Sequence, residues 1–455
     1  MKQQSYNFTE GKILGPLLRF VLPVLLALFL QALYGAVDLL VVGKFAGAED
    51  VSAVSTGSQI MMTITNIVSS MAMGVTVFLA QKVGERDAKA GGRIVGAGVC
   101  LFVAIGAVLT CAIPLLSGAL ARTMQAPAEA FDLTVGYIRI CGFGAIVIIL
   151  YNLIGSIFRG LGDSRTPLVT VMIACGCNVA GDLLLVAGFG MGARGAALAT
   201  VFAQLISVVI SLLLIRKKEL PFAFSLRTIR PNGRLMGKIV ALGAPIALQD
   251  LLVGVSFLVI LAIVNGLGLL ASAGVGVAEK VCAFIMLVPA AFMQAMSAFV
   301  AQNRGAGKLH RAVQGLNCAV AVSVVFGVAM FVLNFFRGDI LSYIFASDPQ
   351  VIAASADYLK AYAVDCLLTC FLFCFTGFCN GLGCTAFVML QSVGAAFLIR
   401  IPVAYVMSRL AANLFFIGLS IPASSAAQIV VCVLFYAYLH RSGRLHSRED
   451  EMEKA

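Results

Sequence analysis

The chain has 455 residues, of which 61% are hydrophobic and only 12% are charged, and its mean hydropathy is +1.01. Soluble domains carry about 25% charged residues, so this composition excludes a single water-soluble globular core. The net charge of +11 at first suggests nucleic-acid binding. However, the basic residues lie in loops between apolar stretches, where they orient a membrane protein and contact anionic lipid headgroups. We therefore expect membrane lipid as a partner and no nucleic acid.

The apolar stretches are continuous, as in membrane-spanning helices, rather than alternating as in the strands of a membrane barrel. A helix needs about 20 apolar residues to cross the hydrocarbon. In chain order, the expected spans are 17–42, 52–80, 93–120, 131–158, 166–188, 192–215, 237–264, 273–300, 312–335, 358–380, 386–408 and 413–438. The sequence thus predicts an all-α membrane protein with twelve transmembrane helices.

The two halves of the chain repeat each other about 221 residues apart. Ala80–Gly84 reads AQKVG and corresponds to AQNRG at Ala301–Gly305, and the triplet GLG occurs at Gly160–Gly162 and again at Gly381–Gly383. Paired repeats are typical of secondary transporters, whose substrate path lies between the halves. We therefore expect two homologous six-helix bundles. Their predicted boundaries are an amino-terminal lobe at 1–215, a cytoplasmic linker at 216–236, a carboxy-terminal lobe at 237–440 and a cytoplasmic tail at 441–455.

The charges in the loops predict the orientation of the chain. The expected inner loops are strongly basic, with the largest cluster between Arg216 and Lys238, whereas each expected outer loop has about one basic residue, such as Arg194. By the positive-inside rule, both termini should lie in the cytoplasm. Residues 1–16 show no cleavable signal, so the first span is the expected insertion signal. We expect a multi-pass monomer in the cell (plasma or inner) membrane.

No motif predicts catalysis or a cofactor. The sequence has no Gly-rich phosphate loop, no His-rich metal cluster and no catalytic dyad, and its three histidines lie in or near loops. Cys366, Cys370 and Cys374 share one helix face and resemble a metal-binding stripe. A closed metal site needs four ligands and no histidine lies near, so packing residues are the better interpretation. We expect neither an enzyme, nor a cofactor, nor a metal centre.

Two carboxylates of the first half fall inside spans. Placing a carboxylate in the bilayer costs a few kcal/mol, so such a residue usually has a functional role. Asp38 and Asp182 lie at similar depth, in the outer half of the first and fifth spans. The polar residues expected near them are Asn178, one turn before Asp182, together with Gln31, Tyr34 and Thr200. Such an oxygen-rich pocket could hold a monovalent cation, including Na⁺, or a proton shared by the two acids. The alternative is that both carboxylates are simply hydrated near the outer surface.

The second half has its own charged residues within or near spans. Arg400 lies in the middle of the eleventh span and needs a carboxylate partner, for which Asp365 on the neighbouring span is the first candidate. Glu279 and Lys280 are adjacent, so they face different directions and do not pair within one helix. We interpret these four residues as a polar network with a structural or gating role, and a direct substrate role stays open.

Several motifs together resemble the multidrug and toxic compound extrusion (MATE) family of transporters. They are Pro23 followed by QALYGAVD at 31–38, the turns AQKVG and AQNRGAG at 80–84 and 301–307, RGLGD at 159–163, Asn178-x-x-x-Asp182, and GAALAT at 195–200. Each motif is weak alone, but their combination is specific and runs from about residue 11 to residue 440. The match is closest to the DinF-like branch of the family.

The resemblance implies a V-shaped twelve-helix carrier that exports organic, often cationic, compounds in exchange for protons or sodium ions. Carried over by motif, its cation site is Asp38, Asn178, Asp182 and Thr200, and Gln31 and Tyr34 line the adjoining substrate cavity. The NorM-like branch also uses acidic residues on the seventh and tenth spans. The corresponding positions here are Val253 and Thr369, neither of which is acidic. The resemblance therefore favours ion coupling in the first half.

The expected mechanism is antiport by alternating access, in which ion uptake at Asp38 and Asp182 weakens substrate binding. The alternative from a neighbouring class is a flippase for lipid-linked oligosaccharide. A flippase would need a cavity lined by several arginines for pyrophosphate, for which Arg400 alone is thin support. A channel would need a selectivity filter or a ring of like charges, and none is evident.

Overall fold

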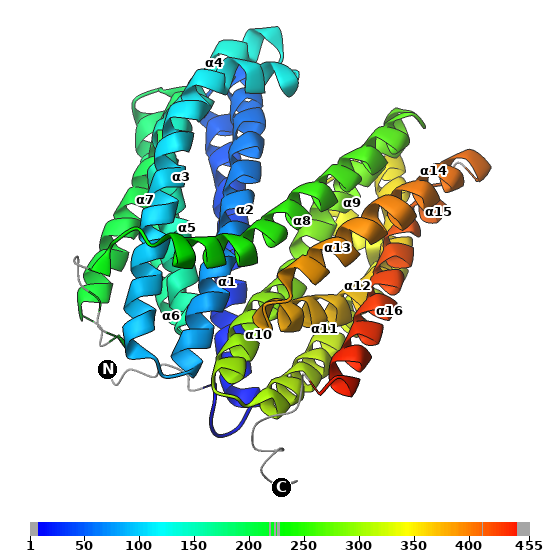
Figure 1. Cartoon of the computed structure of the whole chain (residues 1–455). Coiled ribbons are helices and arrows are strands. Elements are labelled where there is room, and N and C mark those ends of the chain that lie inside the picture. The colour runs from blue at the N-terminus through cyan, green and yellow to red at the C-terminus, as the bar shows by residue number, and fades with distance from the viewer. Residues whose placement is uncertain (1–7, 218–219, 223, 225–227, 412, 444–455) are drawn as a thin grey trace, which may run out of the picture. The chain divides into compact units, whose positions relative to one another are not determined.

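The computed structural model describes residues 8–217, 220–222, 224, 228–411 and 413–443, and every regular element among them is helical. The elements are α1 (Leu14–Phe45), α2 (Ala48–Gly84), α3 (Ala88–Thr123), η1 (Ala128–Ala130), α4 (Phe131–Phe143), α5 (Ala145–Gly160), α6 (Arg165–Asp182), η2 (Leu183–Gly188), α7 (Gly192–Lys217), α8 (Gly233–Asn265), α9 (Leu269–Ile285), α10 (Leu287–Gly305), α11 (Leu309–Tyr343), α12 (Pro349–Gly381), α13 (Thr385–Ala395), η4 (Ala396–Arg400), α14 (Ile401–Leu410), α15 (Leu414–Gly418) and α16 (Ser420–Arg441). Figure 1 shows them in chain order from blue to red. The predicted all-helical membrane fold is confirmed.

Eleven stretches of the described residues are long and apolar enough to cross a membrane, and the pair α4 and α5 brings the number to twelve when it is counted as one span. The expected span 131–158 is therefore a broken helix, bent by 54°. The break falls at Gly144, where an added Cβ would lie 2.6 Å from a methyl group of Val201 on α7. A glycine at this position lets the bend approach α7 closely.

The chain folds as two units. Unit 1 contains the described residues within 22–247, and unit 2 contains residues 8–21 and the described residues within 248–443. Helices α1 and α8 are each shared, since the divisions fall inside them, close to Pro23 and Pro245. The expected linker 216–236 lies partly outside the described residues, and α8 already begins at Gly233. The predicted tail lies outside them beyond residue 443, and the predicted domain boundaries stay a prediction.

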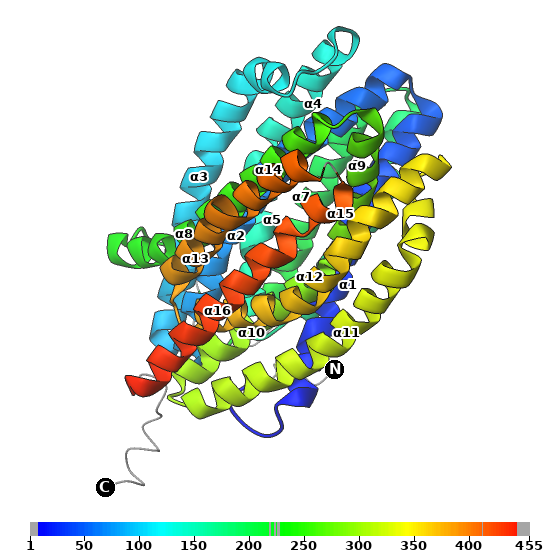
Figure 2. The ribbon, with the colours of Figure 1, turned by 90° about the vertical axis from the view of Figure 1, so that its right-hand side faces the viewer.

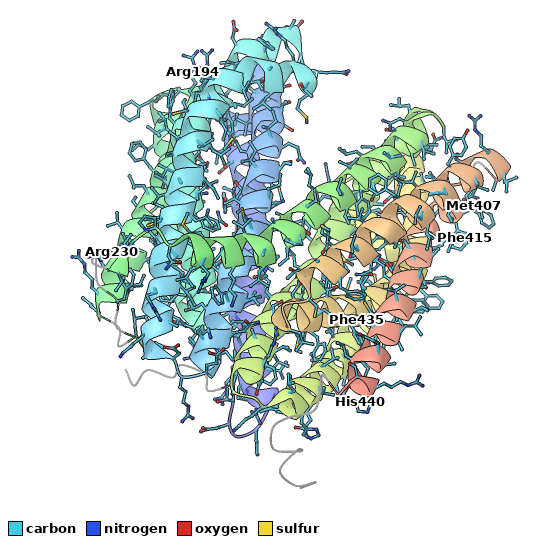
Figure 3. All side chains as sticks on the ribbon, viewed as in Figure 1. Arg194, Arg230, Met407, Phe415, Phe435 and His440 are labelled. Atoms are coloured by element: carbon cyan, nitrogen blue, oxygen red, sulfur yellow. The ribbon has the colours of Figure 1, made fainter. Side chains whose placement is uncertain are left out.

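Unit 1 is held together by apolar residues that face inward from α2, α3, α5 and α7. Phe78, Phe102 and Phe158 are buried together in one cluster, and Tyr137 packs in another. Large apolar side chains also point outward, as lipid-facing helices require, and Figure 3 shows side chains projecting from all sides of the helices. In this view Arg194 lies near the top of unit 1 and Arg230 lies at its left edge.

In unit 2, helix α12 is central and contacts α9, α10, α11, α15 and α16 (Figure 2). The segment before α1 also belongs to this unit. Phe8 is fully buried and meets the rings of Phe20 and Phe299 edge to face, at centroid distances of 5.3 and 5.4 Å. Arg311 of α11 donates hydrogen bonds to the carbonyl oxygens of Phe8, Glu10 and Gly11 at 2.7–2.9 Å. The amino-terminal segment is therefore fastened to unit 2.

The sequence repeat is visible in the backbone of the turns. After α2 the amide of Arg86 bonds to the carbonyl of Val83, and after α10 the amide of Gly307 bonds to that of Arg304, both at about 3 Å. Arg86 (φ 57°) and Gly307 (φ 74°) both adopt the left-handed conformation. The second pair of turns behaves likewise, with Gly162 at φ 79° and Gly383 at φ 75°. The two halves thus share turn geometry as well as motifs.

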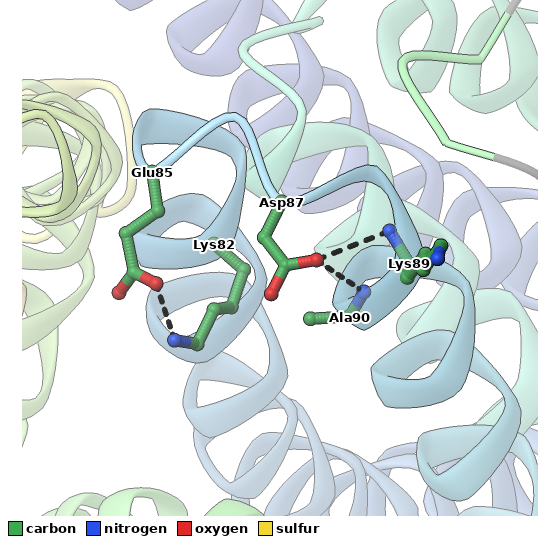
Figure 4. Close-up of polar contacts among 5 residues, drawn as sticks. All are labelled: Lys82, Glu85, Asp87, Lys89 and Ala90. Carbon is green, nitrogen blue, oxygen red and sulfur yellow. Dashed lines mark hydrogen bonds and ion pairs between the residues drawn. The ribbon is translucent and has the colours of Figure 1, made fainter.

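The turn between α2 and α3 is stabilised by Asp87, which lies outside the spans (Figure 4). Its carboxylate accepts hydrogen bonds from the backbone N–H groups of Ala90 (2.9 Å) and Lys89 (3.1 Å), as expected at a helix N-terminus. These bonds, that of Ala90 first, hold the pKa of Asp87 below its ordinary value of 3.8. Lys82 and Glu85 form an ion pair on the same turn (Figure 4).

Candidate functional site

The structure places Asp38 and Asp182 together inside unit 1. Asp38 lies on α1, and Asp182 is the last residue of α6, directly before the π-helical turn η2. Their exposed fractions are 5% and 0%, and the two carboxyl groups lie close enough to interact electrostatically. Neither carboxylate is therefore hydrated at the surface of the unit.

Helix α7 supplies the next partner of the pair. The hydroxyl of Thr200 lies 3.4 Å from Oδ2 of Asp38 and 3.5 Å from Nδ2 of Asn178, and it also lies 3.0 Å from the carbonyl of Ala196. Helices α6 and α7 approach closely here because Gly181 has no side chain. A Cβ added at Gly181 would lie only 2.9 Å from Cβ of Ala199. Small residues thus bring α6 and α7 close enough for their polar groups to meet.

Four oxygen atoms of this cluster lack a hydrogen-bond donor among the described residues. Oδ1 of Asp38, both carboxylate oxygens of Asp182 and Oδ1 of Asn178 are buried without a hydrogen-bond partner among the described residues. Two ionised carboxylates in contact at low dielectric cost several kcal/mol, so one proton or one cation between them would remove a large penalty. The donor set consists of two carboxylates, an amide oxygen and a hydroxyl, which suits either a shared proton or a hard monovalent cation.

A small cavity adjoins the cluster on the side of Asn178 and Thr200. It offers about 10 Å³ to the centre of a water molecule, which is room for roughly one water, and it is lined by Tyr34, Tyr151, Val171, Ala174, Asn178, Thr200, Ala203 and Gln204. Tyr34 interacts with the side chain of Gln204, and Nε2 of Gln31 lies 3.4 Å from the hydroxyl of Tyr151. The structure therefore places Tyr34 in the wall of this cavity, and it places Gln31 against Tyr151 of the same wall.

Sequence reasoning missed Gln204 and Tyr151. Gln204 lies one helical turn after Thr200, so an intramembrane amide at this spacing was a usable signal. Tyr151 carried no such signal because its contact with Gln31 joins helices 120 residues apart in the sequence.

Asp365 and Arg400 of unit 2 are buried but do not form a close ion pair. Asp365 on α12 is 2% exposed and Arg400, at the end of η4, is 6% exposed. They interact electrostatically, although no N···O contact of 4.0 Å or less joins them among the described residues. Nη1 of Arg400 instead donates to Ser256 (3.1 Å), and its guanidinium lies 4.6 Å from the ring centroid of Phe257.

The other members expected in this network lie further out. On α9, Glu279 is half-buried and the adjacent residue Lys280 is exposed. Glu279 comes within electrostatic range of Tyr358 and Cys282, but it makes no ion pair among the described residues. Thr369 is buried and donates to the backbone carbonyl of Asp365 at 2.6 Å. The structure therefore brings Asp365 and Arg400 into one region and leaves Lys280 out of it.

Cys366 and Cys370 of α12 contact protein groups within unit 2. Sγ of Cys370 lies 3.1 Å from the carbonyl of Cys366, and Nδ2 of Asn334 lies 3.7 Å from Sγ of Cys366. Across the described part of the chain, no group of three or more His, Cys, Asp or Glu residues is arranged to hold a metal ion.

Comparison with known proteins gives one family. The profile of the family described as MatE matches residues 23–184 and 245–406, one match in each half. The chain is 27% identical over 358 residues to the probable multidrug resistance protein YpnP of Bacillus subtilis (strain 168), covering 78% of this chain and 80% of the relative. It is 21% identical over 414 residues to the multidrug export protein MepA of Staphylococcus aureus (strain MRSA252), covering 90% of each.

A solved structure shares the fold. The crystal structure of MATE in complex with MaL6 superposes with a TM-score of 0.90 at 18% sequence identity, covering 97% of this chain and 99% of that chain.

Proposed function

This chain belongs to the MATE family of membrane transporters, and from this premise we propose that it exports small organic, often cationic, compounds in exchange for protons or sodium ions. The relatives are named for multidrug resistance and multidrug export, which supports organic compounds as substrates. The membrane-spanning helices and the family together support the role of a membrane transporter.

The observation that carries the coupling proposal is the facing pair Asp38 and Asp182, buried with unpartnered oxygens. In this proposal a proton or sodium ion binds between the carboxylates, with Asn178 and Thr200 as further oxygen ligands. Neutralising the pair changes how α1 packs against α6 and α7. The ion drives export only through its different affinity for the two states of the carrier.

We propose that Tyr34, in the wall of the adjoining cavity, and Gln31, which contacts Tyr151 of that wall, take part in substrate binding. Both lie on α1, one and two helical turns before Asp38, so a rearrangement of α1 caused by ion binding would reach them directly. Tyr34 offers an aromatic face to a cation, and Gln31 is an adaptable hydrogen-bonding group. This link between the two sites on one helix is the physical basis of exchange.

The flippase alternative is not favoured. It requires several arginines around a pyrophosphate, whereas the buried polar centre of unit 1 is acidic and the guanidinium of Arg400 contacts Ser256 and Phe257.

We propose that Asp365 and Arg400, with Glu279 nearby, form a structural or gating network. We further propose that both termini lie in the cytoplasm, because the basic loops lie on one side of the expected topology. We also propose that the protein is a monomer.

The test is ion-driven export by the Asp38→Asn variant in proteoliposomes. We expect imposed pH or sodium gradients to drive efflux of a cationic dye by the wild-type protein, and efflux by Asp38→Asn to fall to the level of protein-free liposomes. Asparagine cannot hold a proton or charge-pair with a cation, while it keeps the size of the side chain.

The matched control is Asp132→Asn, the same change at an exposed position of α4, which should transport like the wild type. Equal monodispersity of the purified variants shows that they are folded. Gradient-driven efflux by a folded Asp38→Asn at the wild-type rate would refute the coupling role.

A further inference from the structure

Helix α7 begins against a carboxylate of another helix. Oδ1 of Asp50, in the first turn of α2, accepts a hydrogen bond from the backbone N–H of Ala193 at 2.8 Å. The first N–H groups of a helix have no partner within the helix, and the residue just before the helix commonly caps them with its side chain. The capping residue of α7 is instead 143 residues away in the sequence. The bond therefore joins two helices as well as capping one of them.

The backbone at the start of α7 leaves room for this carboxylate. A Cβ added at Gly192 would lie 2.2 Å from Oδ1 and 2.7 Å from Cγ of Asp50, so a side chain there would push the carboxylate away. Gly192 also has a φ of 53°, in the left-handed region that glycine adopts readily. The contact thus depends on a glycine at one position and on a side-chain acceptor at the other.

The second half of the chain caps the corresponding helix in a different way. Helix α15 begins at Leu414 and α7 at Gly192, a separation close to that of the sequence repeat. The cap of α15 is its own preceding residue, Asn413, which accepts a hydrogen bond from a backbone N–H of the first turn at 2.8 Å. The counterpart of Asp50, the third residue of α2, is Ala271, the third residue of α9. A cap from the adjoining residue stabilises that helix alone, whereas a cap from α2 also fixes where α7 lies.

The capped end of α7 leads directly to the carboxylate pair. Ala193 and Thr200 are seven residues apart, about two turns of an α-helix, so they lie on the same face of α7. Ala193 meets Asp50 at the start of α2, and Thr200 meets Asp38 on α1. Apolar residues of the same three helices are buried in one cluster, namely Val41, Val42, Ala53, Val54, Ala196 and Ala197. Two polar contacts and this cluster therefore hold α7 against α1 and α2.

We propose that Asp50 is a positioning residue for ion coupling, because its bond to Ala193 holds α7 so that the hydroxyl of Thr200 stays beside Asp38. This inference rests on the proposed ion coupling at Asp38 and Asp182. A ligand that is already in place when the ion arrives costs less to order on binding. Without the bond to Asp50, the first turns of α7 fray and fewer molecules hold Thr200 in place. The apparent affinity for the ion then falls by the same factor as that population.

The experiment measures how the efflux rate of a cationic dye from proteoliposomes depends on the coupling ion, with protons and sodium titrated separately. We expect Asp50→Ala to raise the half-saturating ion concentration about fivefold, the size of effect expected for one lost helix cap, and to keep the maximal rate. Asp50→Asn retains an acceptor oxygen and should keep the wild-type value. Glu49→Ala removes an exposed carboxylate from the same turn and should also behave like the wild type.

Hydrogen exchange reports the position of α7 without any export. The backbone amides from Ala193 to Thr200 should exchange faster in Asp50→Ala than in the wild type, because local opening of these turns becomes easier. Glu49→Ala should leave their exchange unchanged.

A second variant covers the case in which Asp50→Ala does not fold. Gly192→Ala keeps Asp50 but displaces its carboxylate, so both the amide exchange and the half-saturating ion concentration should rise. Its matched control is Gly190→Ala, which has a similar left-handed backbone (φ 65°) but meets no atom within 4 Å, and which should leave both values unchanged.

A folded Asp50→Ala with the amide exchange or the ion dependence of the wild type would overturn the positioning role. So would an equal loss of ion affinity in Glu49→Ala, because the effect would then be one of charge. Efflux by the wild type that responds to neither protons nor sodium would instead refute the proposed coupling. Hydrogen exchange would in that case still decide whether Asp50 holds α7 in place.

Discussion

At the level of single residues, the two units bury charge in different ways. Unit 1 places two like charges, Asp38 and Asp182, against each other with an amide and a hydroxyl beside them. Unit 2 places opposite charges in one region, yet Asp365 and Arg400 stay apart and rely on neutral partners such as Ser256. Two neighbouring carboxylates repel each other and are stabilised by a bound proton or cation, whereas opposite charges already compensate each other. This difference is why we assign ion coupling to unit 1 and a supporting role to unit 2.

The supporting role of Asp365 and Arg400 predicts a coupling energy between them. Asp365→Asn and Arg400→Met should each lower the melting temperature, because each leaves a buried charge without its counter-charge, at a cost of about 3 kcal/mol. The double variant should be less destabilised than the sum of the two by about 1 kcal/mol, as for groups that share one network. Thermal unfolding of the four proteins in detergent measures this cycle. Strict additivity would show that the two charges do not interact.

At the level of the elements, glycines decide where helices cross. Helices α2 and α8 meet within unit 1 at Gly74 and Gly243, where an added Cβ would lie 2.5 Å from the carbonyl of Ile239 and 2.2 Å from that of Met71, respectively. Backbone atoms cannot move aside as a flexible side chain can. These contacts require hydrogen as the side chain at both positions, so the crossing depends on the two glycines together.

The crossing predicts a strong position effect along α8. Gly243→Val should destabilise the protein by about 2 kcal/mol or more through overpacking against the backbone of α2, and should lower the melting temperature. Gly254→Val is the matched control on the same helix, because an added Cβ there meets no atom within 4 Å. Thermal unfolding of both variants checks the expectation. Equal melting temperatures would mean that α2 and α8 do not cross so closely.

At the level of the whole molecule, the apolar spans predict the side on which the chain ends. Eleven spans, with the bent pair counted as a twelfth, predict twelve crossings of the described chain, and an even number returns the carboxy terminus to the side of the amino terminus. The basic loops predict that this side is the cytoplasm. The bent pair crosses the membrane only if its two helices form one span, so the position of the carboxy terminus tests this crossing.

Reporter fusions in a bacterial host measure this topology. A carboxy-terminal green fluorescent protein should be fluorescent and a carboxy-terminal alkaline phosphatase inactive, since each reporter works on one side of the membrane only. An amino-terminal tag should likewise be protected from external protease. Active phosphatase at the carboxy terminus would contradict twelve crossings with cytoplasmic ends.

The sequence by itself determined the spans, the helical class and the repeat, because these depend on local properties. Apolar length against the thickness of the bilayer predicts a span, and the paired motifs at Gly162 and Gly383 encode the same turn through the same backbone conformation. The resemblance of short motifs likewise led to the family, since those motifs lie in both halves.

Only the tertiary structure decided which polar groups meet. Asp38 and Thr200 are 162 residues apart in the sequence, and their contact depends on the close approach of α6 and α7 at Gly181. The same holds for the contact of Gln31 with Tyr151. It also holds for the separation of Asp365 from Arg400, because the sequence offered Asp365 only as the first candidate partner on a neighbouring span. Helix period specifies neighbours within one helix, but contacts between helices follow from the shapes of whole packed faces, to which many residues contribute a little each.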